Sequence, residues 1–198
     1  MKRFFEFGKT GALLLALALM CSFARRSEAG VILADASGNR TQVLVADDAP
    51  ESVVKLADFL SVQTAQITGQ SFQVNRERDA AAAWPVKLYF GATRMAGPYR
   101  AKLGDLNRDG FLILTPEADR VIVAGNSETA LYFAVFRLLE LCGVRFLMPG
   151  EDGTVYPADR KLELPDTNLV TAPAFESRLL SWGGTPQKAV WYDWAAKL

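Results

Sequence analysis

The stretch that decides the fold spans residues 120–150 and reads RVIVAGNSETALYFAVFRLLELCGVRFLMPG. The apolar β-branched run at 121–123 predicts a short strand that is buried on both faces. A Gly-Asn pair then breaks the strand, and the hydroxyl of Ser127 can accept a hydrogen bond from a free backbone N–H in the first turn of a helix. We expect this helix to run to about Cys142 and to end at Gly143, which can adopt the left-handed conformation of a helix terminator.

This helix is predicted to be mostly buried. At 100° per residue, the stripe that can face solvent holds only Thr129, Phe133, Arg137 and Glu140, and the rest of the circumference is apolar. A surface helix shows roughly the reverse balance, so the helix should pack against a sheet. The next strand is predicted at 144–147.

The preceding segment predicts a second helix that lies over one face of a sheet. Residues 41–45 are apolar enough for a strand, and Asp48 with Glu51 has the spacing of a capping box. Pro50 falls in the first turn, where its missing N–H has no cost, and Gly69 terminates the helix. The side chains predicted to be buried by this amphipathic helix are Val53, Leu56, Ala57, Leu60 and Ile67.

Shorter apolar runs predict the remaining strands. Strands that follow each other closely usually pair antiparallel, whereas the two helices imply crossovers, so we expect a mixed sheet. The predicted strands lie at 31–33, 71–74, 86–90, 110–114 and 120–124, with brief extended pieces at 155–156 and 161–164. The segments between them read as a turn at 37–39, a loop or weak helical turn at 75–83, a polar irregular stretch at 97–106 and a hairpin connection at 115–119.

Residues 1–29 have the three parts of a secretory signal peptide: a basic start, an apolar run at 11–24 and a small residue at the cut after Ala29. The apolar run is shorter than the roughly 20 residues that a membrane-spanning helix needs. We expect a secreted or periplasmic protein with no stable membrane span after cleavage. Because Arg25 and Arg26 lie close to the cut, an uncleaved N-terminal anchor is the alternative.

Composition excludes several classes of function. Lysine plus arginine and aspartate plus glutamate number 22 each, and the signal removes mainly basic residues, so the exported chain is mildly acidic. It has no basic stripe for nucleic acid. The absence of histidine from the sequence excludes Ser-His and Cys-His catalysis and the usual zinc sets within this polypeptide. Cys142 remains alone after Cys21 leaves, and its apolar neighbours predict a small buried hydrophobe rather than a nucleophile.

Motifs for cofactors and metals are sparse. The glycine before Ser127 has no following Gly-Lys-Ser/Thr, so it indicates a helix cap rather than a phosphate cradle. The acidic pairs at 47–48 and 151–152 fall in predicted turns and indicate solvated residues rather than a glycosidase acid pair. The Asp/Asn-rich segment 105–110 lacks the bidentate glutamate of a calcium loop, since Pro116 takes that position. We therefore predict no cofactor, metal ligand or catalytic residue in this chain.

The character of the sequence changes after residue 150. From Pro165 the chain reads as a linker, a new apolar-polar alternation begins at 175–182, and a helical pattern begins at 188–198. Three tryptophans, at 182, 191 and 194, need more chain to bury them than these elements provide. We infer one domain at 30–165 and the truncated start of a second at 166–198. An exposed aromatic tail is the alternative, although such a patch is an aggregation liability.

A series of short motifs resembles one known module. In chain order and spacing it is similar to the N-terminal domain of family 67 α-glucuronidases and of related secreted proteins, with a wider likeness to the second domain of β-hexosaminidases. The resemblance covers about residues 40–182. The motifs are VADDAPE at 45–51, ITG at 67–69, LYFG at 88–91, DGF at 109–111, VAGN at 123–126, GVRF at 143–146 and PGE at 149–151.

The resemblance implies an α+β fold, a mixed β-sheet with helices packed on one face, as in β-hexosaminidase domain 2. In the family this domain precedes a (β/α)8 barrel that carries the catalytic carboxylates. The sequence PAFESR at 173–178 resembles the entry into the first barrel strand, and by this resemblance Arg178 contacts sugar hydroxyls; a structural ion pair is the other interpretation. Residues 191–197 resemble the first barrel helix.

These likenesses predict the non-catalytic N-terminal domain of a secreted glycoside hydrolase of α-glucuronidase-like type, which degrades plant-type glycans such as xylan. The carbohydrate partner would bind through the barrel, and this chain alone would be inactive. The alternative is a stand-alone secreted carbohydrate-binding or protein-interaction domain that uses Trp182, Trp191 and Trp194 as its contact surface.

Overall fold

The computed structural model describes residues 30–148 and 153–174, which form an α+β fold around a mixed six-stranded sheet. The predicted signal peptide and residues 175–198 lie outside the described residues. The strands of this sheet are β3 (Thr41–Val45), β4 (Gln73–Arg76), β5 (Val86–Phe90), β6 (Phe111–Glu117), β7 (Arg120–Gly125) and β11 (Asn168–Thr171). Their order across the sheet is β11-β6-β7-β5-β3-β4. The pairs β7-β5, β5-β3 and β3-β4 are parallel, while β11-β6 and β6-β7 are antiparallel.

Strand β7 and the helix after it, α4 (Glu128–Leu141), confirm the prediction for the deciding stretch. The side chains at 121–124 are fully buried. The Ser127 hydroxyl accepts a hydrogen bond from the backbone N–H of Ala130 at 3.0 Å, so the predicted cap is formed. Cys142 follows the last turn, and Gly143 has a φ of +95°. This left-handed conformation is open to glycine at little cost, which is why the helix ends there.

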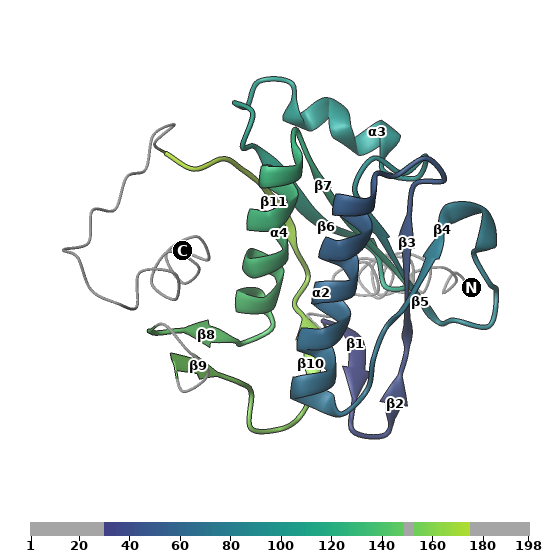
Figure 1. Ribbon diagram of the computed structural model, residues 1–198, viewed down its shortest axis with the longest axis vertical. Helices are drawn as coiled ribbons and strands as arrows, with labels where there is room; N and C mark the ends of the chain where they lie inside the picture. The colour runs from purple at the N-terminus through teal and green to yellow at the C-terminus, as the bar shows by residue number, and fades with distance from the viewer. Residues whose placement is uncertain (1–29, 149–152, 175–198) are drawn as a thin grey trace, which may run out of the picture.

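The two long helices, α2 (Glu51–Thr68) and α4, lie side by side on one face of the sheet (Figure 1). Side chains alternate along the strands, so Val43, Leu88 and Val121 point to the helices while their neighbours in sequence point to the other face. Fully burying an aliphatic side chain contributes about 1.5–3 kcal/mol. The layer between helices and sheet is therefore the main source of stability.

The opposite face is covered by a short helical segment that the sequence did not predict. Residues 97–106 were expected to be irregular, but α3 (Gly97–Arg100) and η2 (Ala101–Leu103) form there. Leu103 inserts against the sheet and is only 1% exposed. The expectation of helices on one face is therefore correct for α2 and α4 only. The short segment formed by α3 and η2 is held against the sheet by one inserted leucine and has no apolar stripe that the sequence could show.

The start of α2 differs from the predicted capping box. Pro50 is the N-cap residue, and no side chain caps the helix. Asp48 is exposed, and the approach to the helix is held from another strand: Nη1 of Arg76 donates to the carbonyls of Ala46 at 3.0 Å and Ala49 at 2.9 Å. The C-terminal prediction is confirmed, since Gly69 has a φ of +79°. Of the five side chains predicted to be buried, only Leu56 is half-buried; the others are buried.

The predicted extended pieces near the ends of the domain form small sheets of their own. Strands β1 (Val31–Asp35), β2 (Gly38–Asn39) and β10 (Leu162–Leu164) form a three-stranded sheet in the order β10-β1-β2. Strands β8 (Arg145–Phe146) and β9 (Thr154–Val155) form an antiparallel pair, so the strand predicted at 144–147 is shorter than expected and lies outside the main sheet.

The predicted linker from Pro165 is wrong for residues 168–171. These residues form β11, which pairs antiparallel with β6 at the edge of the main sheet. The approach is fixed by Thr115, whose hydroxyl accepts from the N–H of Thr167 at 2.7 Å and whose own N–H donates to the Thr167 carbonyl at 2.8 Å. The sheet therefore continues past the predicted boundary at 165.

Candidate functional site

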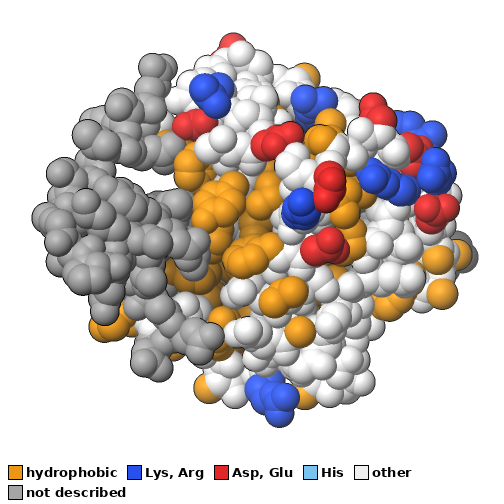
Figure 2. Space-filling view, in the orientation of Figure 1, with side chains coloured by type: hydrophobic (Ala, Val, Ile, Leu, Met, Phe, Trp, Pro, Cys, Tyr) orange, Lys and Arg blue, Asp and Glu red, His pale blue; other side chains and the backbone are white. Residues whose placement is uncertain are grey.

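The first candidate site is the edge of the sheet where the parallel strands β3, β4, β5 and β7 end. After β3 the chain turns to α2 on one face, whereas after β5 it turns to α3 on the other (Figure 1). In open sheets, ligands bind where the connections of neighbouring parallel strands diverge in this way. We call this region the polar edge and define it by Asp47, Glu77, Arg78, Arg94 and Asn126. Charged side chains gather in this part of the molecule (Figure 2).

Glu77 lies at the centre of the polar edge. It begins the single turn η1 (Glu77–Asp79) directly after β4, and its side chain is 9% exposed. One carboxylate oxygen accepts from the backbone N–H of Arg94 at 2.8 Å, and the other accepts from the N–H of Met95 at 3.0 Å. Nε of Arg94 lies 3.4 Å from the same carboxylate. This largely enclosed carboxylate therefore holds the loop that follows β5 against the loop that follows β4.

Asp47 makes the corresponding link from the loop after β3. Its Oδ1 accepts from the backbone N–H of Arg78 at 2.9 Å, and its Oδ2 lies 3.7 Å from Nη2 of Arg94. The Arg94 side chain is 76% exposed, so solvent screens its ion pairs and they contribute little. Three loops are thus joined mainly by carboxylates that accept backbone N–H groups.

Asn126 closes the other side of the polar edge. Its backbone N–H donates to the carbonyl of Gly110 at 2.9 Å. Its side-chain amide donates toward three carbonyls, one at the end of η2 and two in the loop after it: Leu103 at 3.1 Å, Leu106 at 3.3 Å and Asn107 at 3.0 Å. The residue that was predicted only to break a strand therefore also anchors the loop at 103–107.

The chemistry of the polar edge is that of a clamp. Its two carboxylates are directed at backbone N–H groups, and its most prominent cation is paired with them. A general acid or base must instead be within hydrogen-bond reach of a substrate proton. The geometry supports a structural role, in which the polar edge fixes the loops at the end of the sheet.

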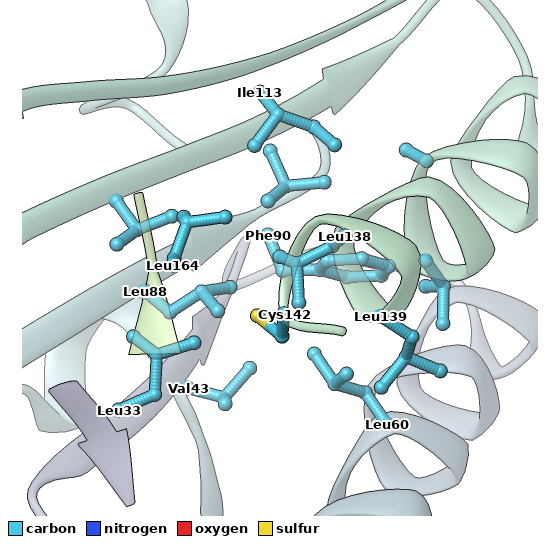
Figure 3. Close-up of a cluster of buried hydrophobic side chains, with 14 of the residues drawn as sticks. Leu33, Val43, Leu60, Leu88, Phe90, Ile113, Leu138, Leu139, Cys142 and Leu164 are labelled. Atoms are coloured by element: carbon cyan, nitrogen blue, oxygen red, sulfur yellow. The ribbon is translucent and has the colours of Figure 1, made fainter. Parts of the chain in front are cut away.

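The thiol of Cys142 is also structural. It lies among Leu138, Leu139 and Leu60 in the core (Figure 3), and desolvation by this burial raises the pKa of the thiol far above its usual range. A nucleophilic cysteine needs the opposite shift, because the thiolate is the reactive form. The prediction of a buried hydrophobe is confirmed.

In the part of the chain that the structure describes, no group of three or more Cys, Asp or Glu side chains is arranged to hold a metal ion. No helix among residues 30–148 and 153–174 has the length and apolar character needed to cross a membrane.

An aromatic cluster is the second feature of note. The Phe136 ring on α4 is 3% exposed, and its centroid lies 5.5 Å from Phe59 on α2, 4.7 Å from Tyr132 and 5.2 Å from Phe146 on β8. Apolar side chains form a continuous band on the viewed face (Figure 2). Ring pairs at such distances add about 0.5–1.5 kcal/mol each beyond the burial of their area. The cluster fastens the β8-β9 pair to the two long helices.

The sequence-predicted site residue, Arg178, lies outside the described residues, as do Trp182, Trp191 and Trp194. Sequence reasoning missed the role of Arg76 before α2 and the roles of Glu77 and Arg94 at the polar edge. The partners of these residues lie 17 to 31 positions away in the sequence, so no local pattern predicted the contacts.

These observations define the class of the molecule as an α+β domain whose polar edge is built from structural contacts. No family model matches the sequence, and no curated protein matches it. Among solved structures, one that is similar is a family GH115 4-O-methyl-α-glucuronidase with specificity for decorated arabinogalactans. That likeness has a TM-score of 0.46 and 13% sequence identity, and it covers 74% of this chain and 19% of that chain.

Proposed function

We propose that this chain is the non-catalytic N-terminal domain of a secreted glycoside hydrolase of α-glucuronidase-like type. In this proposal the signal at 1–29 is cleaved after Ala29 and directs export to the periplasm or the medium. A (β/α)8 barrel that follows the domain carries the catalytic carboxylates and binds the plant-type glycan. Arg178, at the entry to the first barrel strand, contacts sugar hydroxyls.

The positions of the family-like motifs in the fold support the proposal. The motifs ITG, LYFG and GVRF contribute Gly69, Gly91 and Gly143, which are the three glycines with positive φ among the described residues. They end α2, β5 and α4. Positive φ favours glycine strongly, so a related domain with the same elements needs glycine at the same points. The resemblance therefore rests on residues that the architecture requires.

The chemistry of the polar edge supports a non-catalytic role. Glu77 and Asp47 accept hydrogen bonds from the backbone of neighbouring loops and so act within the domain. Catalysis in the complete protein is accordingly assigned to the barrel, and the domain would shape the approach of the glycan.

The proposal is tested first by the intact mass of the native secreted product, isolated with an antibody against residues 40–150. We expect a product several times heavier than the 198-residue chain, and release of glucuronic acid from glucuronoxylan oligosaccharides by that product. A product with the mass of the exported chain alone, with no hydrolytic activity, contradicts the proposal. If that short product bound oligosaccharides, the function would be that of a stand-alone carbohydrate-binding domain, and the glycoside hydrolase proposal would be wrong.

The role of Arg178 has its own test in the complete product. Arg178→Ala should raise KM for the oligosaccharide while the thermal unfolding temperature stays within a few degrees of that of the unmodified protein. Arg108→Ala is the matched control, because Arg108 is 81% exposed and its closest acid is the neighbouring Asp109. An unchanged KM for Arg178→Ala would contradict a contact with sugar and favour the other interpretation, in which Arg178 forms a structural ion pair.

A further inference from the structure

Two cationic side chains lie next to each other on the face of the main sheet that points away from α2 and α4. Leu44, Tyr89 and Ile122 pack together on that face. Because side chains alternate along a strand, Lys87 lies on the same face as Tyr89, and Arg120 lies on the same face as Ile122. Lys87 and Arg120 are register partners on the adjacent parallel strands β5 and β7. We call Lys87, Tyr89 and Arg120 the cationic group.

The two positive charges of the cationic group are only partly balanced. Adjacent strands are about 4.8 Å apart, and like charges directly opposite each other destabilise a sheet. Lys87 forms no ion pair with a described residue, and its Nζ donates to the carbonyl of Trp84 at 3.3 Å. Nη1 of Arg120 donates to Glu117 at 3.0 Å, but Glu117 is 56% exposed, so solvent screens this pair. Glu117 can balance one of the two cations and leaves the other unbalanced.

The hydroxyl of Tyr89 is the third donor of the cationic group. Tyr89 is 8% exposed, and no described residue forms a hydrogen bond with its hydroxyl. Buried side-chain polar groups normally have such a partner. Burial raises the pKa of this hydroxyl, and the positive charge of Arg120 acts in the opposite direction. Glu77 and Asp119 also raise the pKa, but by smaller amounts. Arg120 is therefore the charged residue with the strongest effect on the hydroxyl, which stays protonated and can donate.

We infer that Lys87, Tyr89 and Arg120 form a binding site for the carboxylate of a small acidic ligand. The ammonium and guanidinium groups have N–H groups beyond those that Trp84 and Glu117 accept, and a planar guanidinium matches the two oxygens of a carboxylate. The single unbalanced charge fits a monoanion better than a phosphate, which carries a charge of about −1.5 to −2.

The surroundings of the cationic group are compatible with such a ligand. The Arg120 side chain is 26% exposed and Lys87 is half-buried, so a ligand can reach both from solvent. The acidic residue nearest in sequence to Arg120 is Asp119, which is exposed, so solvent screens its charge. In a protein that acts on plant-type glycans, the source of the carboxylate is a uronic acid. The uronic acid rests on the proposed function, whereas the carboxylate site does not.

The test is an NMR titration of the exported form of this chain at constant ionic strength, in which backbone amide shifts are followed as ligand is added. Sodium acetate and sodium glucuronate should both produce saturable shifts at Lys87, Tyr89 and Arg120, whereas neutral glucose should not. Lys87→Gln and Tyr89→Phe should each weaken the affinity for acetate about tenfold, because each removes a hydrogen bond to a charged ligand. Glu117→Gln should strengthen it, because it releases Nη1 of Arg120, and loss of the fold cannot produce that result.

Lys55→Gln is the matched control, because Lys55 is 72% exposed on α2 and pairs with Glu51 at 2.8 Å. It should leave the affinity unchanged, and far-UV circular dichroism verifies that each variant is folded. The absence of saturable shifts with both anions overturns the inference, and so do equal shifts with glucose or equal affinities in the Lys87, Tyr89 and Lys55 variants.

The comparison between the two anions tests the uronic acid separately. Tighter binding of glucuronate than of acetate supports it, whereas equal binding supports the carboxylate site and contradicts the uronic acid as its specific ligand. The titration uses this chain alone, so its result is independent of the product mass and the hydrolytic activity that test the proposed function.

Discussion

Replacing Glu77 with glutamine should destabilise the domain by about 2.5–4 kcal/mol, although the two side chains have nearly the same size. The carboxylate of Glu77 uses each oxygen for a different backbone N–H, that of Arg94 at 2.8 Å and that of Met95 at 3.0 Å. An amide offers one oxygen and one NH2 group. In either orientation the NH2 group faces an N–H donor, so one backbone N–H loses its acceptor.

The magnitude follows from these two bonds. A hydrogen bond to a charged group contributes about 1.5–3 kcal/mol and a neutral one about 0.5–1.5 kcal/mol. Glu77→Gln loses one charged bond and reduces the other to a neutral bond, at a side chain that is only 9% exposed. The ion pair with Arg94 adds little to this sum, because that guanidinium is 76% exposed and screened by solvent.

Urea unfolding at neutral pH and moderate salt, followed by circular dichroism, measures the loss. With an m-value of about 2 kcal/mol per molar urea, the midpoint should fall by about 1–2 M. Glu117→Gln is the matched control: Glu117 is 56% exposed and pairs with Arg120 at 3.0 Å, so its change should cost less than about 0.5 kcal/mol. Equal midpoints for the two variants would refute the clamp that we assign to Glu77.

Three further predictions concern the elements around the core. Ser127→Ala should cost about 1 kcal/mol in urea unfolding, because it removes the cap of α4, and Ser127→Asp should restore most of this loss; the cap is unimportant if the two variants unfold alike. Gly91→Ala should cost about 1–2 kcal/mol, because its φ is +84°, whereas Gly38→Ala, with open space around the added carbon, should leave the melting temperature unchanged. Cys142 should react with iodoacetamide at pH 8 only as fast as the domain unfolds, because burial raises the pKa of its thiol; rapid alkylation of the folded protein would contradict this.

The sequence predicted best those elements whose signals lie within a few residues. The strand β5 has the predicted bounds, and the cap at Ser127 and the terminators at Gly69 and Gly143 formed as expected. A hydroxyl that accepts from an N–H three residues later, or a glycine with positive φ, depends on local backbone geometry alone. Such features are visible without knowledge of the rest of the fold.

The errors occurred where a distant partner replaced a local signal. The spacing of Asp48 and Glu51 predicted a capping box, but Arg76 from β4 binds the carbonyls before the helix instead. The segment 168–171 read as a linker because it lies between Pro165 and Pro173, yet it pairs with β6 at the edge of the main sheet. In both cases the competing interaction joins residues far apart in the sequence, so no local pattern contained it.

By itself, the sequence determined that residues 120–143 form a buried strand, a capped helix and its terminator, and that two long helices accompany a mixed sheet. Periodicity, caps and glycines act over one or two turns of chain, and they carry that information locally. Only the tertiary structure decided that β3 lies between β4 and β5, that β8 leaves the main sheet, and that Glu77 meets the loop after β5. These arrangements depend on which surfaces come together when the core forms, and the hydrogen bonds that fix them join residues that the sequence keeps apart.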